Sequence, residues 1–368
     1  MIRDSAGVRI VIASASAVSA GKAWSVDTVP LVKVGGSAGA GDADLQLVVG
    51  AMRQSDGTIV VADQGSSQLK YFASDGTLRT AVGRQGEGPG EFQYLAWLRA
   101  CGGDSAFVED IGARRVHVFT PSGALARSFA LLGPERNTAF SASCSRQGRI
   151  LTTGWGDLRQ RKVGAFRPMV GVAFASREGE PTVSLGSFPG TEMFGREQDG
   201  FPRRAGKWLR IAVAGNTAWV ATNQVRDLRG YDTTGALRVV IRREGDEPTF
   251  SAADRAFIQQ LALDSALNER QRLDVQRELQ LVELPDSPPS VSELVADAMG
   301  NVWARPFPRA DRRNPAWWVH GPDGAFVGEV VLPEDVQVLE IGDDYVLGLC
   351  NDAATGHSVV VFTLRKGT

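Results

Sequence analysis

Cysteine, histidine and lysine are scarce in this sequence, which limits the metal sites and the nucleic-acid contacts that the chain can form. It has 3 Cys and 3 His among 368 residues. Because His117, His320 and His357 lie in separate segments, a shared zinc site is not predicted. Only six of the 40 basic residues are Lys, the Arg residues are scattered over many loops, and the net charge is −2. Such a chain lacks the basic field that gathers phosphate backbones, so nucleic acid is not an expected partner.

Long hydrophobic runs are also missing. No stretch approaches the roughly 18 apolar residues of a membrane span, and no charged region followed by an apolar core marks a signal peptide. We therefore expect a chain without a transmembrane segment, associated with a membrane only through a partner or through an N-terminal anchor missing from this sequence. Gly-x-Ser-x-Gly, Walker and His-Glu-x-x-His elements are absent as well. The sequence thus predicts no catalytic residue.

Glycine and proline, by contrast, are spread along the whole chain, with 42 Gly and 17 Pro. This distribution favours an all-β fold of short strands joined by tight turns. A repeat supports it: a turn at Asp56-Gly57 leads into an apolar strand, an alternating strand follows, and a second turn lies at Asp75-Gly76. The same unit recurs with its turn at Gly123, 47 residues after Gly76.

Six such units, with two longer intervals that read as insertions, predict a single six-bladed β-propeller over residues 1–368. The third unit is too degenerate for its strands to be placed. The apolar segments 7–13 and 29–34 have no unit of their own, and we expect them to complete the last blade beside the C-terminal strand, where they remove an exposed edge.

One segment breaks the β pattern. Residues 251–281 contain no Gly or Pro, their apolar residues have helical spacing, and Ser251 precedes Asp254 by three residues, as in a capping box. This predicts a helical insertion between blades 4 and 5. It serves either as a lid packed on one face of the propeller or as a docking helix for a partner.

The segment 82–92, Val-Gly-Arg-Gln-Gly-Glu-Gly-Pro-Gly-Glu-Phe, closely resembles the loops between blades in NHL-repeat propellers. With the segments 3–11 and 289–303, the chain resembles six-bladed propeller proteins of environmental bacteria, which are often secreted or lipid-anchored. The resemblance covers residues 1–130 and 285–326 best. It implies the fold and an extracytoplasmic location, periplasmic or at the cell surface, but no set of catalytic residues.

Several side chains are candidates for a specific role. Cys101 and Cys144 fall at equivalent positions of neighbouring units, 43 residues apart, which predicts a disulfide; two buried thiols are the alternative. Asp63 and Asp110 are also equivalent, and are more simply read as acceptors of backbone N–H groups than as metal ligands.

The glycine-rich loop suggests a further site. Its backbone amides, together with Arg84, Gln85 and Glu87, form a candidate loop for an anion or a partner, although tight turning between blades explains the glycines without any ligand.

Three functions are compatible with these observations. The first is a non-enzymatic binding or scaffold propeller outside the cytoplasm, with a protein partner or a ligand and no cofactor. The second is a metal-dependent enzyme like lactonase, esterase or lyase propellers, with Ca²⁺ in the central channel. The third is an extrinsic subunit of a membrane-associated complex. Asp, Asn or Glu side chains converging on the channel axis would favour the second.

Overall fold

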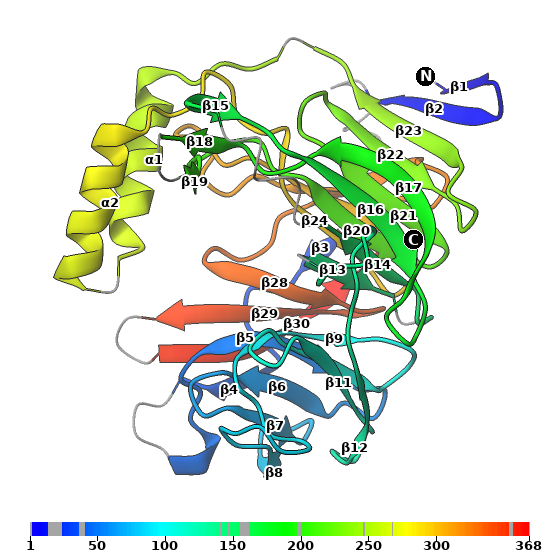
Figure 1. The fold of residues 1–368 in the computed structure, drawn as a ribbon, viewed down its shortest axis with the longest axis vertical. Coiled ribbons are helices and arrows are strands. Elements are labelled where there is room, and N and C mark those ends of the chain that lie inside the picture. The colour runs from blue at the N-terminus through cyan, green and yellow to red at the C-terminus, as the bar shows by residue number, and fades with distance from the viewer. Residues whose placement is uncertain are drawn as a thin grey trace.

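The computed structural model describes residues 2–13, 24–36, 41–139, 141–145, 147–154, 162–196, 200–245, 247–266, 268–352 and 356–367, without the side chains of 141 and 142. Strands in small antiparallel sheets are the predominant regular structure of this chain (Figure 1), as the sequence predicts. None of the described helices is long and apolar enough to cross a membrane.

Six sheets follow one another along the chain. The first three consist of β5 (Val48–Arg53), β6 (Ile59–Asp63), β7 (Gln68–Phe72) and β8 (Leu78–Val82); β9 (Leu95–Ala100), β10 (Ala106–Asp110), β11 (Arg115–Phe119) and β12 (Leu125–Phe129); and β13 (Ser141–Cys144), β14 (Ile150–Thr153), β16 (Met169–Ala175) and β17 (Pro181–Pro189). The next three are built on β20 (Arg210–Ala214), β21 (Thr217–Ala221), β22 (Asp227–Tyr231) and β23 (Leu237–Arg243); β24 (Val291–Ala296), β25 (Val302–Pro306), β26 (Trp317–His320) and β27 (Phe326–Val330); and β28 (Val336–Ile341), β29 (Tyr345–Asp352) and β30 (Gly356–Arg365).

The first strands of the six sheets form a closed ring. Each of β5, β9, β13, β20, β24 and β28 contacts the next, and β28 contacts β5 again. The space between neighbouring sheets is filled by large apolar side chains, among them the fully buried Trp219 and Trp303. Turns such as Asp75-Gly76 place glycine at φ +90, a left-handed backbone conformation that other residues rarely adopt. These local turns explain why the repeat can be read in the sequence.

The N-terminal segments take two different positions. β4 (Val32–Gly35) pairs with the C-terminal strand β30, as does the short β3 (Ser25–Val26). The expectation for residues 7–13 is wrong: β1 (Ile2–Ser5) and β2 (Val8–Ala13) form a hairpin whose second strand pairs in parallel with β23 of the fourth sheet. The outer edge of β23 offers unpaired backbone groups just as β30 does, and β2 covers it while burying Val11 and Ala13.

Further elements lie before and after the fourth sheet along the chain. A three-stranded sheet of β15 (Gly164–Phe166), β18 (Met193–Gly195) and β19 (Gly200–Pro202) uses residues flanking β16 and β17. Between β23 and β24 lie two helices, α1 (Ala252–Asp264) and α2 (Glu269–Leu281), at one side of the molecule (Figure 1). The described part of residues 251–281 thus forms two helices where the sequence suggested one helical segment, because α1 ends at Asp264 with Ser265 as its C-cap and Asn268 caps a new helix. A 3₁₀ turn, Gly41–Ala43, precedes β5.

Candidate functional site

The ring of first strands encloses a central cavity of about 150 Å³. Small apolar side chains such as Ala51 and Ala212 line much of it, together with the guanidinium-bearing Arg99 and the carboxylates of Asp297 and Glu340. Asp297 accepts hydrogen bonds from two backbone amides, from the Asn301 amide and from the Trp303 indole. Glu340 accepts hydrogen bonds from the Arg53 amide and the Tyr345 hydroxyl.

This donor set does not fit a Ca²⁺ ion in the cavity. A Ca²⁺ site needs six to eight oxygen ligands, whereas here the carboxylates are already engaged and the Arg99 guanidinium repels a cation. Burial lowers the pKa of Arg99, with Glu340 opposing the shift. Among the described residues, no group of three or more His, Cys, Asp or Glu side chains is placed to hold a metal.

The three histidines do not come together. His117 Nδ1 lies 2.8 Å from Ser128 Oγ, and His320 Nδ1 lies 3.1 Å from the Gly324 carbonyl. His357 Nδ1 accepts a hydrogen bond from the Val48 amide at 2.9 Å. His357 lies within β30. Each ring therefore has a structural partner of its own.

Asp63 and Asp110 occupy equivalent buried positions and act as backbone acceptors. Asp63 Oδ1 accepts the amides of Gln46 and Leu47, and Asp110 accepts those of Gln93, Tyr94 and Ala113. Asp63 also forms a buried salt bridge with Lys70, at 3.3 Å. These contacts hold the chain that precedes the first strands of the first and second sheets. This is the structural role that the sequence favours.

The glycine-rich loop already contains its own anion. The Glu91 carboxylate accepts the Gly88 amide at 2.9 Å and pairs with Arg84 at 2.6 Å. The Gly88 hydrogen bond, followed by Arg84, lowers the pKa of Glu91. Gln85 Oε1 accepts the Ser67 hydroxyl, and Glu87 is exposed. The Gly88 amide and Arg84 belong to the loop predicted to bind an anion, and both bind the Glu91 carboxylate instead.

Cys101 and Cys144 are joined by a disulfide, with Cα atoms 5.5 Å apart. It links the ends of β9 and β13, the first strands of neighbouring sheets. Cys350 on β29 is a free cysteine, and burial raises the pKa of its thiol.

A larger hollow lies under the helices, and we call it the insertion pocket. It has a volume of about 550 Å³. Its walls come from β19 and the chain after it, from the two helices and from the end of β25: Phe201, Pro202, Arg203, Arg204, Ala205, Trp208, Phe257, Ile258, Leu261, Ala262, Ser265, Glu278, Phe307 and Pro308. Four aromatic rings, from three separate parts of the sequence, therefore face one space.

Helix α1 is fixed at the pocket by its N-terminus and by its apolar face. Ser251 and Asp254 form the predicted capping box. The Asp254 carboxylate also binds Arg309 at 2.6 Å, and these hydrogen bonds outweigh burial and lower its pKa. Ile258 is buried with Phe250 and Leu284, and Phe257 and Phe307 pack against this cluster. No side chain of α2 is fully buried.

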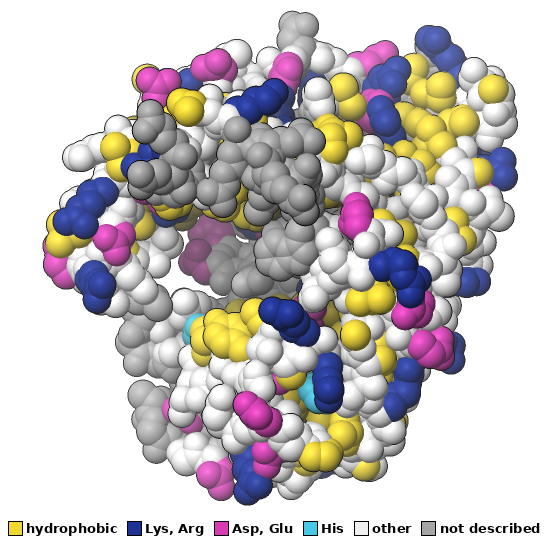
Figure 2. Space-filling view, in the orientation of Figure 1, with side chains coloured by type: hydrophobic (Ala, Val, Ile, Leu, Met, Phe, Trp, Pro, Cys, Tyr) yellow, Lys and Arg dark blue, Asp and Glu magenta, His cyan; other side chains and the backbone are white. Residues whose placement is uncertain are grey.

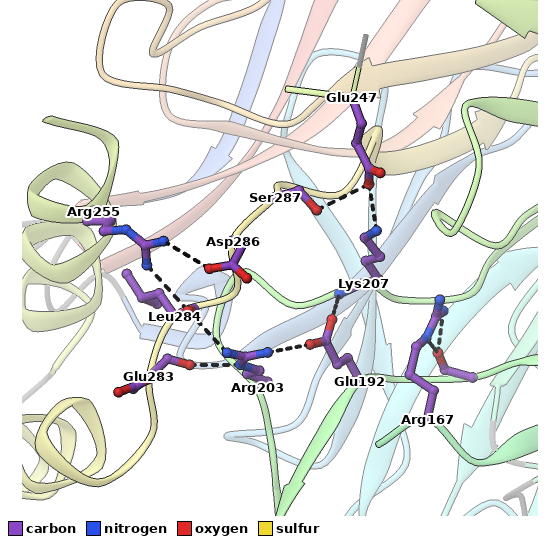
Figure 3. Close-up of polar contacts among 11 residues, drawn as sticks. Arg167, Glu192, Arg203, Lys207, Glu247, Arg255, Glu283, Leu284, Asp286 and Ser287 are labelled. Carbon is purple, nitrogen blue, oxygen red and sulfur yellow. Dashed lines mark hydrogen bonds and ion pairs between the residues drawn. The ribbon is translucent and has the colours of Figure 1, made fainter. Parts of the chain in front are cut away.

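A polar network ties the segment after α2 to the chain after β19 (Figure 3). Arg203 pairs with Glu192 at 2.8 Å and donates to the carbonyls of Glu283 and Leu284. Glu192 also accepts the Lys207 amide, and the Lys207 ammonium pairs with Glu247. These contacts hold the two walls of the insertion pocket at a fixed separation.

Charge inside the pocket wall is compensated. The guanidinium of Arg204 pairs with both oxygens of Glu278, at 2.8 and 2.9 Å, so that neither charge faces the space alone. Leu261, with 53% of its surface exposed, continues the apolar wall toward solvent. Charges of both signs are interspersed over the face of the molecule seen in Figure 2.

Sequence reasoning predicted helical structure within residues 251–281 but missed the pocket. Trp208 is one of 8 Trp, and no motif marks Trp208, Phe201 or Phe307. Aromatic residues in the connections that interrupt the repeat are the signal that could have found this site.

No protein-family model and no curated protein matches this sequence. The chain is nevertheless similar in structure to solved proteins, among them the following. A Bacteroides fragilis protein assigned as exported has a TM-score of 0.50 at 13% identity, covering 98% of this chain and 100% of its own. A DUF4221-family member from Bacteroides vulgatus has a TM-score of 0.51 at 9% identity, covering 93% and 99%. Virginiamycin B lyase from Staphylococcus aureus has a TM-score of 0.41 at 10% identity, covering 87% and 96%.

The structural neighbours are β-propeller-like proteins, and they include enzymes as well as the protein assigned as exported. At these identities the likeness shows the fold and no activity. The disulfide is compatible with an extracytoplasmic location.

Proposed function

We propose that the six sheets are the blades of one six-bladed propeller spanning residues 1–368, with α1 and α2 inserted between blades 4 and 5. The ring of contacts among the six first strands supports this assignment. We further propose that the propeller is a non-enzymatic binding protein that works outside the cytoplasm, and that the insertion pocket holds its ligand.

The observation that carries this proposal is the pocket itself. A volume of about 550 Å³ falls in the range of small-molecule sites, roughly 300 to 1,000 Å³, which are mostly apolar with a few polar groups. Four aromatic rings and Leu261 supply the apolar walls, and the pairing of Arg204 with Glu278 removes the cost of facing a lone charge. The polar network on Arg203 keeps the walls apart, so the site is formed before a ligand arrives.

Of the two roles considered for the insertion, the packing of α1 favours the lid. Ile258 and Ala262 are buried against the body of the protein, whereas the opposite side of the helix faces solvent. A lid that roofs an apolar space provides a binding site for a small molecule. The central cavity supports an enzyme less well, because its carboxylates are engaged and it carries Arg99.

The test is a fluorescence titration with N-phenyl-1-naphthylamine, a neutral aromatic probe. We expect saturable binding by the intact protein. Leu261→Asp puts a charge at the edge of the apolar wall without opening the core, and should weaken binding by about tenfold. Leu273→Asp makes the same change on α2, at a residue 44% exposed that does not line the pocket, and should leave binding unchanged.

Two results would refute the proposal. One is the absence of saturable binding by the native protein, and the other is equal weakening by Leu261→Asp and Leu273→Asp. Circular dichroism of both variants establishes that they fold.

A further inference from the structure

The charged side chains that line the insertion pocket are paired within the protein. Among the described residues, the pocket is lined by three charged side chains, those of Arg203, Arg204 and Glu278. Arg203 pairs with Glu192 at 2.8 Å. Arg204 Nε lies 2.8 Å from one carboxylate oxygen of Glu278, and Arg204 Nη2 donates to the other at 2.9 Å. The two pairs together carry no net charge.

The two pairs differ in how far they are accessible. The side chains of Arg203 and Glu192 are 14% and 12% exposed, and Arg203 also donates to two backbone carbonyls, so this pair belongs to the framework. The side chains of Arg204 and Glu278 are 31% and 27% exposed, and both line the pocket. Arg204 follows β19 whereas Glu278 lies on α2, so this second pair joins two walls of the pocket.

We propose that the ion pair of Arg204 and Glu278 selects against charged ligands, so that the insertion pocket takes a neutral, apolar molecule. The proposal rests on the binding function argued above and adds the chemical class of the ligand. An anion near Arg204 also meets the Glu278 carboxylate, and a cation near Glu278 also meets the Arg204 guanidinium. Either ion loses water without gaining an unopposed partner, which is unfavourable. A neutral ligand contacts the four rings and leaves the ion pair intact.

This selection can be changed in either direction by removing one member of the pair. Without the Glu278 carboxylate, the Arg204 guanidinium lines the pocket as a cation without its partner and attracts an anion. Without the guanidinium, the carboxylate repels the same anion. A purely apolar wall also accepts neutral ligands, but it contains no charge that such a substitution could uncover. Opposite effects of the two substitutions are therefore the signature of the proposed role.

A matched pair of probes measures this effect. 1-Anilinonaphthalene-8-sulfonate has the aromatic body of N-phenyl-1-naphthylamine with one added sulfonate, and the native protein should bind the neutral probe more tightly. We expect Glu278→Gln to lower the dissociation constant of the sulfonate probe about three- to tenfold, and Arg204→Gln to raise it by a similar factor. The neutral probe should change less than about twofold in both variants. Added salt should reduce both effects on the sulfonate probe.

Asp274→Asn is the matched control. Asp274 lies on α2 like Glu278 and pairs with Arg277 at 3.5 Å, but neither residue lines the insertion pocket. This substitution removes the same negative charge from the same helix and leaves an arginine without its partner, and it should change the binding of neither probe. It separates binding at the pocket from adsorption of an anionic dye to a more positive helix. Circular dichroism of each variant establishes that it folds.

The outcomes separate this proposal from the binding function. If the ratio of the two dissociation constants is unchanged in Glu278→Gln, or moves in the same direction in Arg204→Gln, the ion pair does not select the ligand, while the binding site stands. The same conclusion follows if Asp274→Asn shifts the ratio as much as Glu278→Gln does, or if the native protein binds the sulfonate probe more tightly than the neutral one. If neither probe saturates on the native protein, the binding function itself is refuted.

Discussion

Glu109 should give the protein a pH-dependent stability that a single substitution removes. Its side chain lies on β10, is 8% exposed, and forms no salt bridge with the described residues. Burial raises the pKa of Glu109 to about 7; a hydrogen bond with the Trp97 side chain opposes this effect, and the neighbouring Asp110 charge adds to it. Below this pH the folded protein keeps a neutral carboxyl group there.

The sign follows from comparing the folded and unfolded states. The unfolded chain loses the Glu109 proton near pH 4.5, whereas the folded chain keeps it until about pH 7. The contribution of Glu109 to the free energy of unfolding is therefore complete below pH 4.5 and falls as the pH rises to about 7. The difference between these two pKa values corresponds to about 3 kcal/mol in total.

The wild-type pH profile alone does not reveal this change, because His320 opposes it. Burial lowers the pKa of His320 to about 4. The unfolded state thus binds more protons at this position between about pH 4 and 6.5, so the His320 contribution grows as the pH rises. The difference between the protein and its Glu109→Gln variant removes the His320 contribution, since both proteins share that residue.

The assay is urea unfolding of both proteins at pH 5.0 to 8.5. Gln resembles the neutral carboxyl group in shape and charge, so we expect the two proteins to differ by less than about 1 kcal/mol at pH 5. At pH 8.5 Glu109→Gln should be the more stable, by about 3 kcal/mol. A difference that stays constant across this range would show that Glu109 does not bury its carboxyl group as described.

Two further predictions concern the framework. Replacing the buried Lys70 by Met removes the cationic partner of the Asp63 carboxylate. We expect this to lower the free energy of unfolding, measured in urea, by about 3 to 5 kcal/mol. Arg238→Gln, which removes an exposed ion pair, should have little effect. Replacing both Cys101 and Cys144 by Ser opens a loop of 43 residues, and should cost up to about 4 kcal/mol by the chain-entropy relation; a reductant should produce the same loss in the native protein and none in the variant.

Features fixed by short stretches of sequence could be predicted. The turn at Asp75-Gly76 needs glycine for its left-handed backbone, and the capping box of Ser251 and Asp254 needs only four residues. Both are local, so both are visible in the sequence. The equivalence of Asp63 and Asp110 also follows from the repeat, and so does the pairing of Cys101 with Cys144.

Features set by partners distant in sequence could not be predicted. β2 pairs with β23 because two sheet edges were available to an apolar N-terminal strand, and its own residues do not distinguish them. The third sheet could not be recognised in the sequence, because β15 lies between β14 and β16 along the chain but pairs with β18 in another sheet. This interruption breaks the spacing of the repeat. The insertion pocket depends on Phe201, Phe257 and Phe307 meeting in space.

The positions of these features indicate where such a propeller acquires a binding site. In connections that keep the repeat, polar groups bind one another. In the glycine-rich loop, the Glu91 carboxylate binds the Gly88 amide and Arg84, so these groups do not bind a ligand. Connections that break the repeat supply the insertion pocket, with Phe201 from the chain before the fourth sheet and Phe257 from the chain after it. Repeated units give a rigid framework, but the loops that join them are similar to one another. Connections of unequal length bring different side chains together. Ligand chemistry in this protein should therefore be sought around α1.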